Sequence, residues 1–151
     1  LRRGDVLVVE GGAIGRPAYL DEPLPGISFQ KTLNRVRPIP GQASGRFLFY
    51  ALQRLDRAGY HAAHIDSVSM PHLTAERLMV VEVPAPPIDV QEKSAALLDQ
   101  LTAKIDTLIA KAERFIELSK ERRAALITAA VTGQIDVRDH AAGERVLEGI
   151  G

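Results

Sequence analysis

A long stretch without proline or glycine constrains this chain more than any other feature. It runs from Asp89 to Thr132. The adjacent prolines Pro86 and Pro87 stand just before it, and Gly133 follows it. Asp89 with Glu92 three residues later predicts an N-cap and capping box, and Gly133 predicts the C-terminal stop. At about 1.5 Å per residue, such a helix is ~65 Å long. A small domain is narrower than that, so part of the helix surface needs a partner.

An apolar stripe with heptad spacing runs along this predicted helix. Two sets of positions seven residues apart form it: Leu98, Ile105, Ala112, Ser119 and Leu126, and Leu101, Leu108, Phe115, Arg122 and Ala129. Because Ser119 and Arg122 interrupt the seam, the pattern favours antiparallel pairing with a second helix over a strict dimeric zipper. The alternative is an amphipathic helix packed on its own domain. The interface residues we expect are Leu101, Ile105, Leu108, Ala112, Phe115 and Ile116.

Length and composition limit the possible classes of protein. The 151 residues suffice for about one domain plus an extension. The absence of cysteine excludes disulfides and thiol chemistry and is natural for an intracellular protein. No apolar run approaches the ~20 residues of a membrane span. Since the chain starts at Leu1 and opens almost directly on a strand-like run, we expect the protein's N-terminus to lie upstream.

Charge is distributed unevenly although the formal net charge is zero. Residues 1–61 hold nine Lys and Arg against five Asp and Glu, a net charge of +4. The helical part is balanced, and the tail from residue 136 is acidic. The basic first part is compatible with a nucleic-acid partner but does not establish one.

The part before the long helix alternates short strands with a helix. We expect strands at residues 6–10, 18–20, 32–37 and 79–83, a helix from Ser44 to about residue 55, a polar loop at 60–73, and one helical turn capped by Thr74. The fold class is therefore α+β: a small mixed α/β domain followed by one long coiled-coil-forming helix. The expected boundaries are 1–87 for the domain, 88–135 for the helix and 136–151 for a flexible tail.

Two motifs suggest small-ligand chemistry, and each has a simpler explanation. The glycine loop at residues 11–15 follows a strand, but it lacks the spacing of a dinucleotide or P-loop motif. A tight turn, or close approach to a partner, explains it better. His61, His64 and His72, with Asp66, are metal-ligand types without the spacing of a known site class, so we expect no metal. No set of residues can be placed together as a catalytic site.

Polar and basic residues favour DNA reading instead. Arg and Lys suit phosphates, whereas Gln, Asn, Arg, His and Ser can read base edges. The alternative is a solvated strand face and loop, with Lys and Arg stems covering apolar surface. The DNA-binding residues we expect are Arg16, Gln30, Lys31, Arg35, His64 and Ser67.

Several segments together resemble the specificity subunit of type I restriction–modification systems. They are residues 4–7, 12–15, 29–31, 35–38, 71–74, 83–87, 89–92, 116–118 and 120–138. The Pro-Pro-x-x-x-Gln-Glu start of the long helix and its Leu-Ile-Thr-x-Ala-Val-Thr-Gly end, at this separation, are specific together. The likeness covers nearly everything from Gly4 to Arg138.

The resemblance implies a target-recognition domain followed by a conserved spacer helix. A full subunit of this family has two such units, with the spacer helices antiparallel, and each recognition domain reads one half of a split double-stranded DNA target. The subunit is non-catalytic and needs no cofactor. It binds adenine methyltransferase subunits and restriction subunits with translocase and nuclease activity, in the cytoplasm of a bacterium or archaeon.

The chain departs from that pattern because it holds one unit, and we expect the recognition domain of that unit to lack an N-terminal part. A fragment of a two-unit protein, a half-length subunit that dimerises, and an incomplete piece all fit. The competing function is a docking or dimerisation module built on the helix without DNA binding. A third hypothesis is a small enzyme or metal protein built on the histidine loop.

Overall fold

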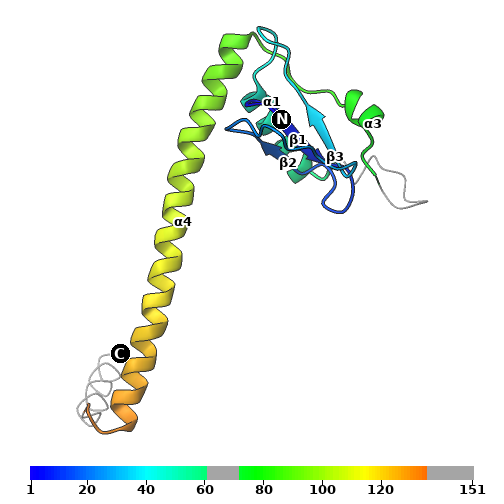
Figure 1. The fold of residues 1–151 in the computed structure, drawn as a ribbon. Helices are drawn as coiled ribbons and strands as arrows, with labels where there is room; N and C mark the ends of the chain where they lie inside the picture. The colour runs from blue at the N-terminus through cyan, green and yellow to red at the C-terminus, as the bar shows by residue number, and fades with distance from the viewer. Residues whose placement is uncertain (61–71, 136–151) are drawn as a thin grey trace, which may run out of the picture. The chain divides into compact units, whose positions relative to one another are not determined.

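The computed structural model describes residues 1–60 and 72–135, which form an α+β fold. Its elements are β1 (Val6–Val9), β2 (Pro17–Tyr19), β3 (Leu33–Val36), α1 (Gly45–Arg57), α3 (Ala75–Met79) and α4 (Ile88–Val131), shown in Figure 1. The α+β class predicted from the sequence is confirmed. Residues 1–100 form one compact unit and residues 101–151 another, and α4 contributes to both.

A three-stranded antiparallel sheet organises the first unit, in the order β2-β1-β3. Val6 pairs with Tyr19 on one side and with Val36 on the other, so the central strand is β1. Val6 and Val8 are fully buried, whereas Leu7 and Val9, which alternate with them along β1, are half-buried. This alternation shows that one face of the sheet carries the core.

The core lies between that face and α1. Val6 and Val8 cluster with Leu52 of α1 and Leu73, and six half-buried residues pack around them: Ile14, Tyr19, Val36, Leu48, Phe49 and Leu78. The core is small, so a few well-packed side chains hold the sheet, α1 and the segment at residue 73 together.

Helix α1 begins as its sequence predicts. The Ser44 Oγ accepts a hydrogen bond from the Phe47 N–H at 3.4 Å, which caps the helix. Gly45 follows, packed so closely on Gly4 that a Cβ at position 45 would overlap the Gly4 carbonyl oxygen. A residue without a side chain is therefore required where α1 meets the start of the chain.

Helix α3 is confirmed, but the strand predicted after it is wrong. The Thr74 hydroxyl accepts from the Arg77 N–H, and the helix runs for five residues to Met79. Residues 80–87 contain no strand, and the Met79 and Val80 side chains are about three-quarters exposed. The β-branched run at 80–83 has strand propensity, but no neighbouring strand pairs with it.

Helix α4 is a single element of 44 residues, about 66 Å long. Its start differs from the prediction: the Pro87 carbonyl accepts from the N–H groups of Val90 and Gln91, so Asp89 lies inside the first turn and is not the N-cap. Its end is as predicted. Gly133 has a φ of 73°, and the Gln134 N–H donates to the Ala129 carbonyl, which forms a Schellman stop.

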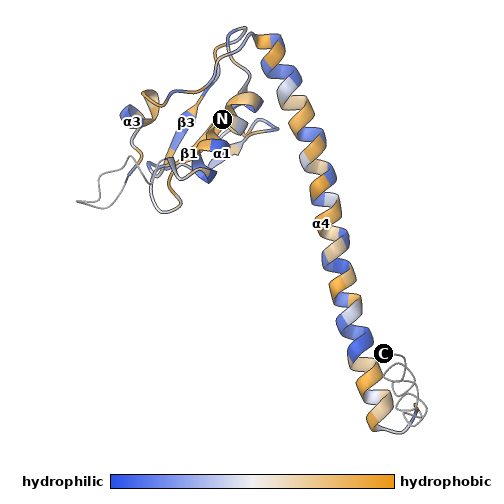
Figure 2. Ribbon diagram, turned by 180° about the vertical axis from the view of Figure 1, so that it is seen from behind, coloured by the Kyte–Doolittle hydropathy of each residue, from blue (hydrophilic) through white to orange (hydrophobic). Residues whose placement is uncertain are grey.

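Polar and apolar residues alternate along most of α4, whereas its last two turns are mainly apolar (Figure 2). In the described part of the chain, none of the helices combines the length and apolarity needed to cross a membrane. The tail predicted at 136–151 lies outside the described residues. The predicted boundary at residue 87 differs from the division at residue 100, and the role of each part stays a prediction.

Candidate nucleic-acid interface

One end of the sheet gathers three connections that are far apart in sequence. Where β1 ends, the Glu10 N–H donates to the Thr32 carbonyl at 2.8 Å, and the Leu73 N–H donates to the Glu10 carbonyl at 2.8 Å. The Val9 N–H also donates to the Arg16 carbonyl at 3.1 Å. The glycine loop, the turn before β3 and the segment at residue 73 therefore meet at one end of the sheet.

The glycine loop is built as a tight turn, as expected. Gly12 and Gly15 both have a φ of 82°, a conformation that favours glycine. The Gly15 N–H donates to the Val9 carbonyl at 2.9 Å, which closes the loop on itself. A Cβ at Gly11 would lie 3.1 Å from the His72 Nδ1, so this loop and His72 are neighbours.

Four of the predicted DNA-binding residues lie at or near this end. Arg16 directly precedes β2, Gln30 and Lys31 precede β3, and Arg35 is on β3; all four are exposed. The Arg35 guanidinium lies 5.8 Å from the centre of the Phe29 ring. Long basic side chains and an amide are therefore presented to solvent beside the glycine turn, an arrangement that suits a phosphate backbone.

The other two predicted DNA-binding residues, His64 and Ser67, lie outside the described residues. The same holds for His61 and Asp66 of the suggested metal cluster, whereas His72 is described and exposed. Within residues 1–60 and 72–135, no group of three or more His, Cys, Asp or Glu side chains could hold a metal ion.

Two polar residues of β3 and its end have structural roles. The Asn34 Nδ2 donates to the Leu73 carbonyl at 2.6 Å, which attaches the segment before α3 to the sheet. Arg37 forms two hydrogen bonds of 2.7 Å with the buried carboxylate of Asp5. Because both side chains are engaged within the fold, we assign them to the fold and not to DNA.

The environment of Asp5 strongly favours its charged form. The Arg37 hydrogen bonds outweigh the opposing effect of burial, and the Arg2 N–H donates to the Asp5 Oδ2 at 2.9 Å, so the pKa of Asp5 falls from 3.8 to about 2. Sequence reasoning missed this pair. It becomes visible only when the register places residue 5 opposite residue 37, one step beyond the Val6–Val36 pair.

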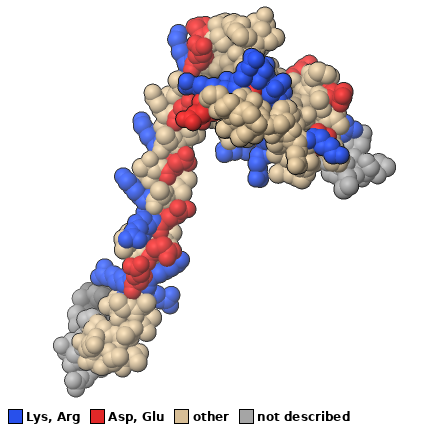
Figure 3. Space-filling view, in the orientation of Figure 1, with Lys and Arg blue, Asp and Glu red and all other residues tan. Residues whose placement is uncertain are grey.

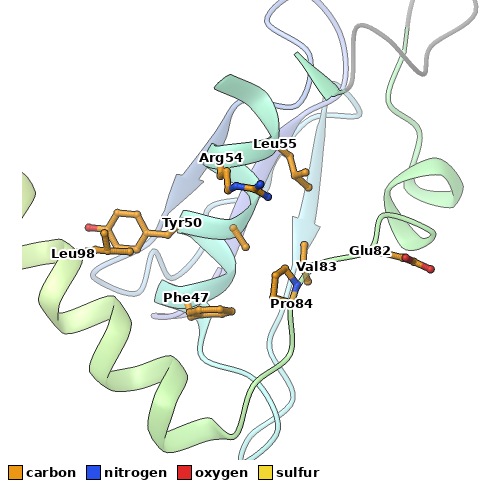
Figure 4. A pocket seen from close by; sticks show the side chains of 9 residues that line it. Phe47, Tyr50, Arg54, Leu55, Glu82, Val83, Pro84 and Leu98 are labelled. Atoms are coloured by element: carbon orange, nitrogen blue, oxygen red, sulfur yellow. The ribbon is translucent and has the colours of Figure 1, made fainter. Parts of the chain in front are cut away.

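Two hollows are lined by described residues of the first unit. One, of about 200 Å³, is almost entirely apolar and is shown in Figure 4; Phe47, Tyr50, Ala51, Arg54, Leu55, Glu82, Val83, Pro84 and Leu98 line it. The other, of about 530 Å³, adjoins Arg35 of the predicted site and is lined by Phe29, Leu33, Asn34, Arg35, Val36, Ala75, Leu78 and Met79. The first lining offers almost no polar surface to orient a small polar ligand, whereas the second includes the polar side chains of Asn34 and Arg35.

Basic side chains are spread over the face of the first unit that Figure 3 shows, with acidic side chains between them. A nucleic-acid partner of this surface would therefore be bound by particular positions and not by one uniform basic field.

The predicted helix interface consists of exposed side chains in the second unit. Leu101, Ile105, Leu108, Phe115 and Ile116 are between 45% and 71% exposed, and Ala112 is exposed as well. Large apolar groups left in water at regular helical spacing are typical of a helix that has a partner. Which helix covers them stays a prediction.

Comparison with known proteins agrees with the resemblance found in the sequence. Residues 1–117 match the family described as type I restriction modification DNA specificity domain. The chain is also 34% identical over 97 residues to the specificity subunit of the type I restriction enzyme EcoBI from Escherichia coli; the match covers 62% of this chain and 19% of that subunit. The chain thus spans about a fifth of the length of this relative. The chain belongs to the type I restriction modification DNA specificity domain family.

Proposed function

We propose that the chain reads one half of a split DNA target as part of a type I specificity subunit. The family supports recognition of a DNA sequence. The observation that carries the proposal in this chain is the exposed set Arg16, Gln30, Lys31 and Arg35 around the glycine turn, where three connections meet. Basic side chains bind phosphates, and Gln30 and the arginines can read base edges.

Binding of the full-length protein to a random-sequence duplex pool at several salt concentrations tests the proposed residues. Lys31→Ala and Arg35→Ala should each weaken binding and reduce the slope of log K against log salt by about 1. Lys93→Ala, an exposed lysine on α4, is the matched control and should leave the slope unchanged. Unchanged slopes in both site variants, with normal folding, would exclude this assignment.

The proposed role of α4 is to pair with a second spacer helix, from the same subunit or from a second copy. Antiparallel pairing places each residue of one heptad set opposite a residue of the other set. One register engages all ten seam positions of two copies: Leu98 with Ala129, Leu101 with Leu126, Ile105 with Arg122, Leu108 with Ser119, and Ala112 with Phe115. The large Phe115 then meets the small Ala112, twice, at the centre of the pair.

The exposed area is sufficient for such a pair. Six large apolar side chains of the two heptad sets, together with the flanking Ile109 and Ile116, are 37% to 71% exposed, which makes eight in all. At about 100 Å² each they present ~800 Å² per helix, so two copies would bury the ~1,600 Å² of a standard-size interface.

The alternative function, a dimerisation or docking module without DNA binding, uses the same stripe. It predicts an intact oligomer and no duplex affinity.

The wider role follows from the family and is also a proposal. The subunit would hold adenine methyltransferase subunits and restriction subunits at the target, without catalysing a reaction itself, in the bacterial or archaeal cytoplasm. Co-purification of a neighbouring methyltransferase with the full-length protein tests this scaffold role. Loss of co-purification in the Leu108→Asp variant would show that the helix binds the methyltransferase. Full retention would show that another surface binds it.

A further inference from the structure

Helix α4 is attached to the first unit at its first turn by a buried glutamine. Gln91 is 2% exposed, and its side-chain amide forms hydrogen bonds with three backbone groups. The Oε1 accepts from the Ser44 N–H at 3.0 Å, and the Nε2 donates to the carbonyls of Gln42 and Pro86 at 3.2 and 2.7 Å. One side chain thus joins the start of α4 to the cap of α1 and to the segment that leads into α4.

A second attachment lies two turns further along α4. The Asp99 Oδ1 accepts from the Arg46 Nε and from the Tyr50 hydroxyl, each at 2.6 Å. Both donors are on α1, one turn apart. The Arg46 guanidinium also lies 4.7 Å from the centre of the Tyr19 ring, between the strand and the helix. These contacts bind α4 to α1, and α1 is in turn held to β2 through Arg46 and Tyr19.

The two attachments are separated along a rigid element. Gln91 and Asp99 are eight positions apart, about 12 Å along the helix. Ala95, halfway between them, is buried at 3% exposure. One attachment leaves a helix free to swing about it, whereas two attachments on one face fix its direction. We propose that Gln91, Arg46, Tyr50 and Asp99 are positioning residues that hold the start of α4, as far as Gln100, in one direction on the recognition unit, and thereby set the separation of the two DNA half-sites.

This inference rests on the proposed function for its biological meaning, but its mechanical part stands alone. If the helix direction is fixed, a single spacing between half-sites fits the protein. If an attachment is lost, the helix samples several directions, and targets with neighbouring spacings become acceptable. The base contacts are not involved, so the half-site sequences themselves should not change.

The mechanical part is tested by distance measurement between two spin labels on the full-length protein. The chain has no cysteine, so Arg57→Cys on α1 and the exposed Gln100→Cys on α4, both in the first unit, provide unique labelling sites once any cysteines elsewhere in the protein are replaced. Labelled protein is diluted into an excess of unlabelled protein to isolate distances within one copy. The distance distribution should be narrow, and Asp99→Asn or Arg46→Met should broaden it about twofold.

Control variants distinguish a change in the direction of α4 from a loss of protein stability. Asp89→Asn removes an exposed carboxylate that pairs with Lys93 within α4 itself, so it should leave the distribution narrow. Gln91→Met keeps the side-chain length but leaves three backbone groups unpaired, and it should broaden the distribution further if the protein folds. Because Asp99 is 38% exposed, its variant should fold even where the Gln91 variant does not. A narrow distribution in folded Asp99→Asn and Arg46→Met protein would overturn the proposal.

The functional part is tested by mapping methylated sites in cells that express the variant with its methyltransferase. Asp99→Asn should leave both half-site sequences intact while methylation at spacings one base pair longer or shorter rises about tenfold. A single spacing in this variant, with broadened label distances, would show that the attachments do not set the half-site separation. Absence of any split motif with the unaltered protein would instead refute the proposed function, and the label distances would still decide the mechanical part.

Discussion

Arg37 and Asp5 form a bidentate ion pair that joins the end of β3 to the start of β1. The Arg37 Nε donates to the Asp5 Oδ1 and the Nη2 donates to the Oδ2, both at 2.7 Å. The Asp5 side chain is 1% exposed and that of Arg37 is 34% exposed. A carboxylate so deeply buried needs this partner, because a buried charge without one is strongly unfavourable. The pair is therefore a requirement of the small sheet.

Replacing the arginine should destabilise the protein markedly. Arg37→Leu leaves the Asp5 carboxylate buried and unpaired, and we expect a loss of about 2 kcal/mol in the free energy of unfolding. Urea denaturation followed by circular dichroism measures it. The exposed Arg3→Leu is the control and should change stability by less than about 0.5 kcal/mol. A similar effect of both variants would contradict the structural role of the pair.

The same pair predicts how stability depends on pH. The pKa of Asp5 is about 2 in the folded protein, below its ordinary 3.8. The unfolded chain therefore binds more protons between these values, and stability falls as pH falls through that window. Denaturation midpoints between pH 6 and pH 2 should show a loss of about 2 kcal/mol from this group. In Arg37→Leu the loss in this window should largely disappear; an unchanged profile would show that other carboxylates cause it.

For the Gly45→Ala variant, packing and helix propensity predict opposite changes in the stability of the protein. Alanine is the better helix former by about 1 kcal/mol, so propensity alone predicts that Gly45→Ala stabilises α1. The added methyl group would overlap the Gly4 carbonyl oxygen, which belongs to the backbone and cannot rotate away. We expect a net loss of about 2 kcal/mol in thermal or urea denaturation. Stabilisation would show that the chain start moves freely away from α1.

The proposed register of the paired helices can be tested by disulfide crosslinking, because the chain has no cysteine of its own. In the antiparallel register, the double variant Leu101→Cys with Leu126→Cys should form a crosslinked dimer under mild oxidation. Each single variant should not, because the two copies of position 101 would be separated by about 25 residues, or ~37 Å.

The single variants discriminate between the alternatives. A parallel pair would crosslink through each single cysteine, since identical positions then face one another. No crosslink in any variant would mean that a different helix, such as a second spacer of the same subunit, covers the stripe. Leu101→Cys with Leu118→Cys is a matched control, because Leu118 lies outside the two seam sets.

Elements with a strong local signal could be predicted from the sequence. The capping residues Ser44 and Thr74 start α1 and α3, and Gly133 ends α4 as a left-handed residue. Local side-chain and backbone chemistry determines these positions, so a single sequence reveals them. The strand pair β1–β2 was also predicted, with β2 displaced by one residue to Pro17–Tyr19.

Features that depend on distant partners could not be predicted. The run after Met79 has strand propensity, but a strand needs a neighbour, and none pairs with it in the described residues. The prediction of Asp89 as N-cap was wrong because the preceding Pro87 carbonyl already accepts the first helical hydrogen bonds. The contacts of Gln91 and Asp99 with α1 were missed, since residues 47 to 53 positions apart leave no local pattern.

The predicted DNA-binding residues show the same division. Arg16, Gln30, Lys31 and Arg35 were chosen by type, and the structure places them near one end of the sheet through the Val9–Arg16 and Glu10–Thr32 hydrogen bonds. Their contacts with DNA stay a prediction. Asn34 and Arg37 are also of residue types that can read base edges, but their side chains form hydrogen bonds within the fold.

The most direct test of the central claim is a map of adenine methylation in a host that expresses the full-length gene with a neighbouring methyltransferase gene. The account predicts a split, two-part methylated motif that disappears when this gene is deleted. A soluble, co-purifying methyltransferase without any such motif would contradict DNA recognition and leave a docking module as the function.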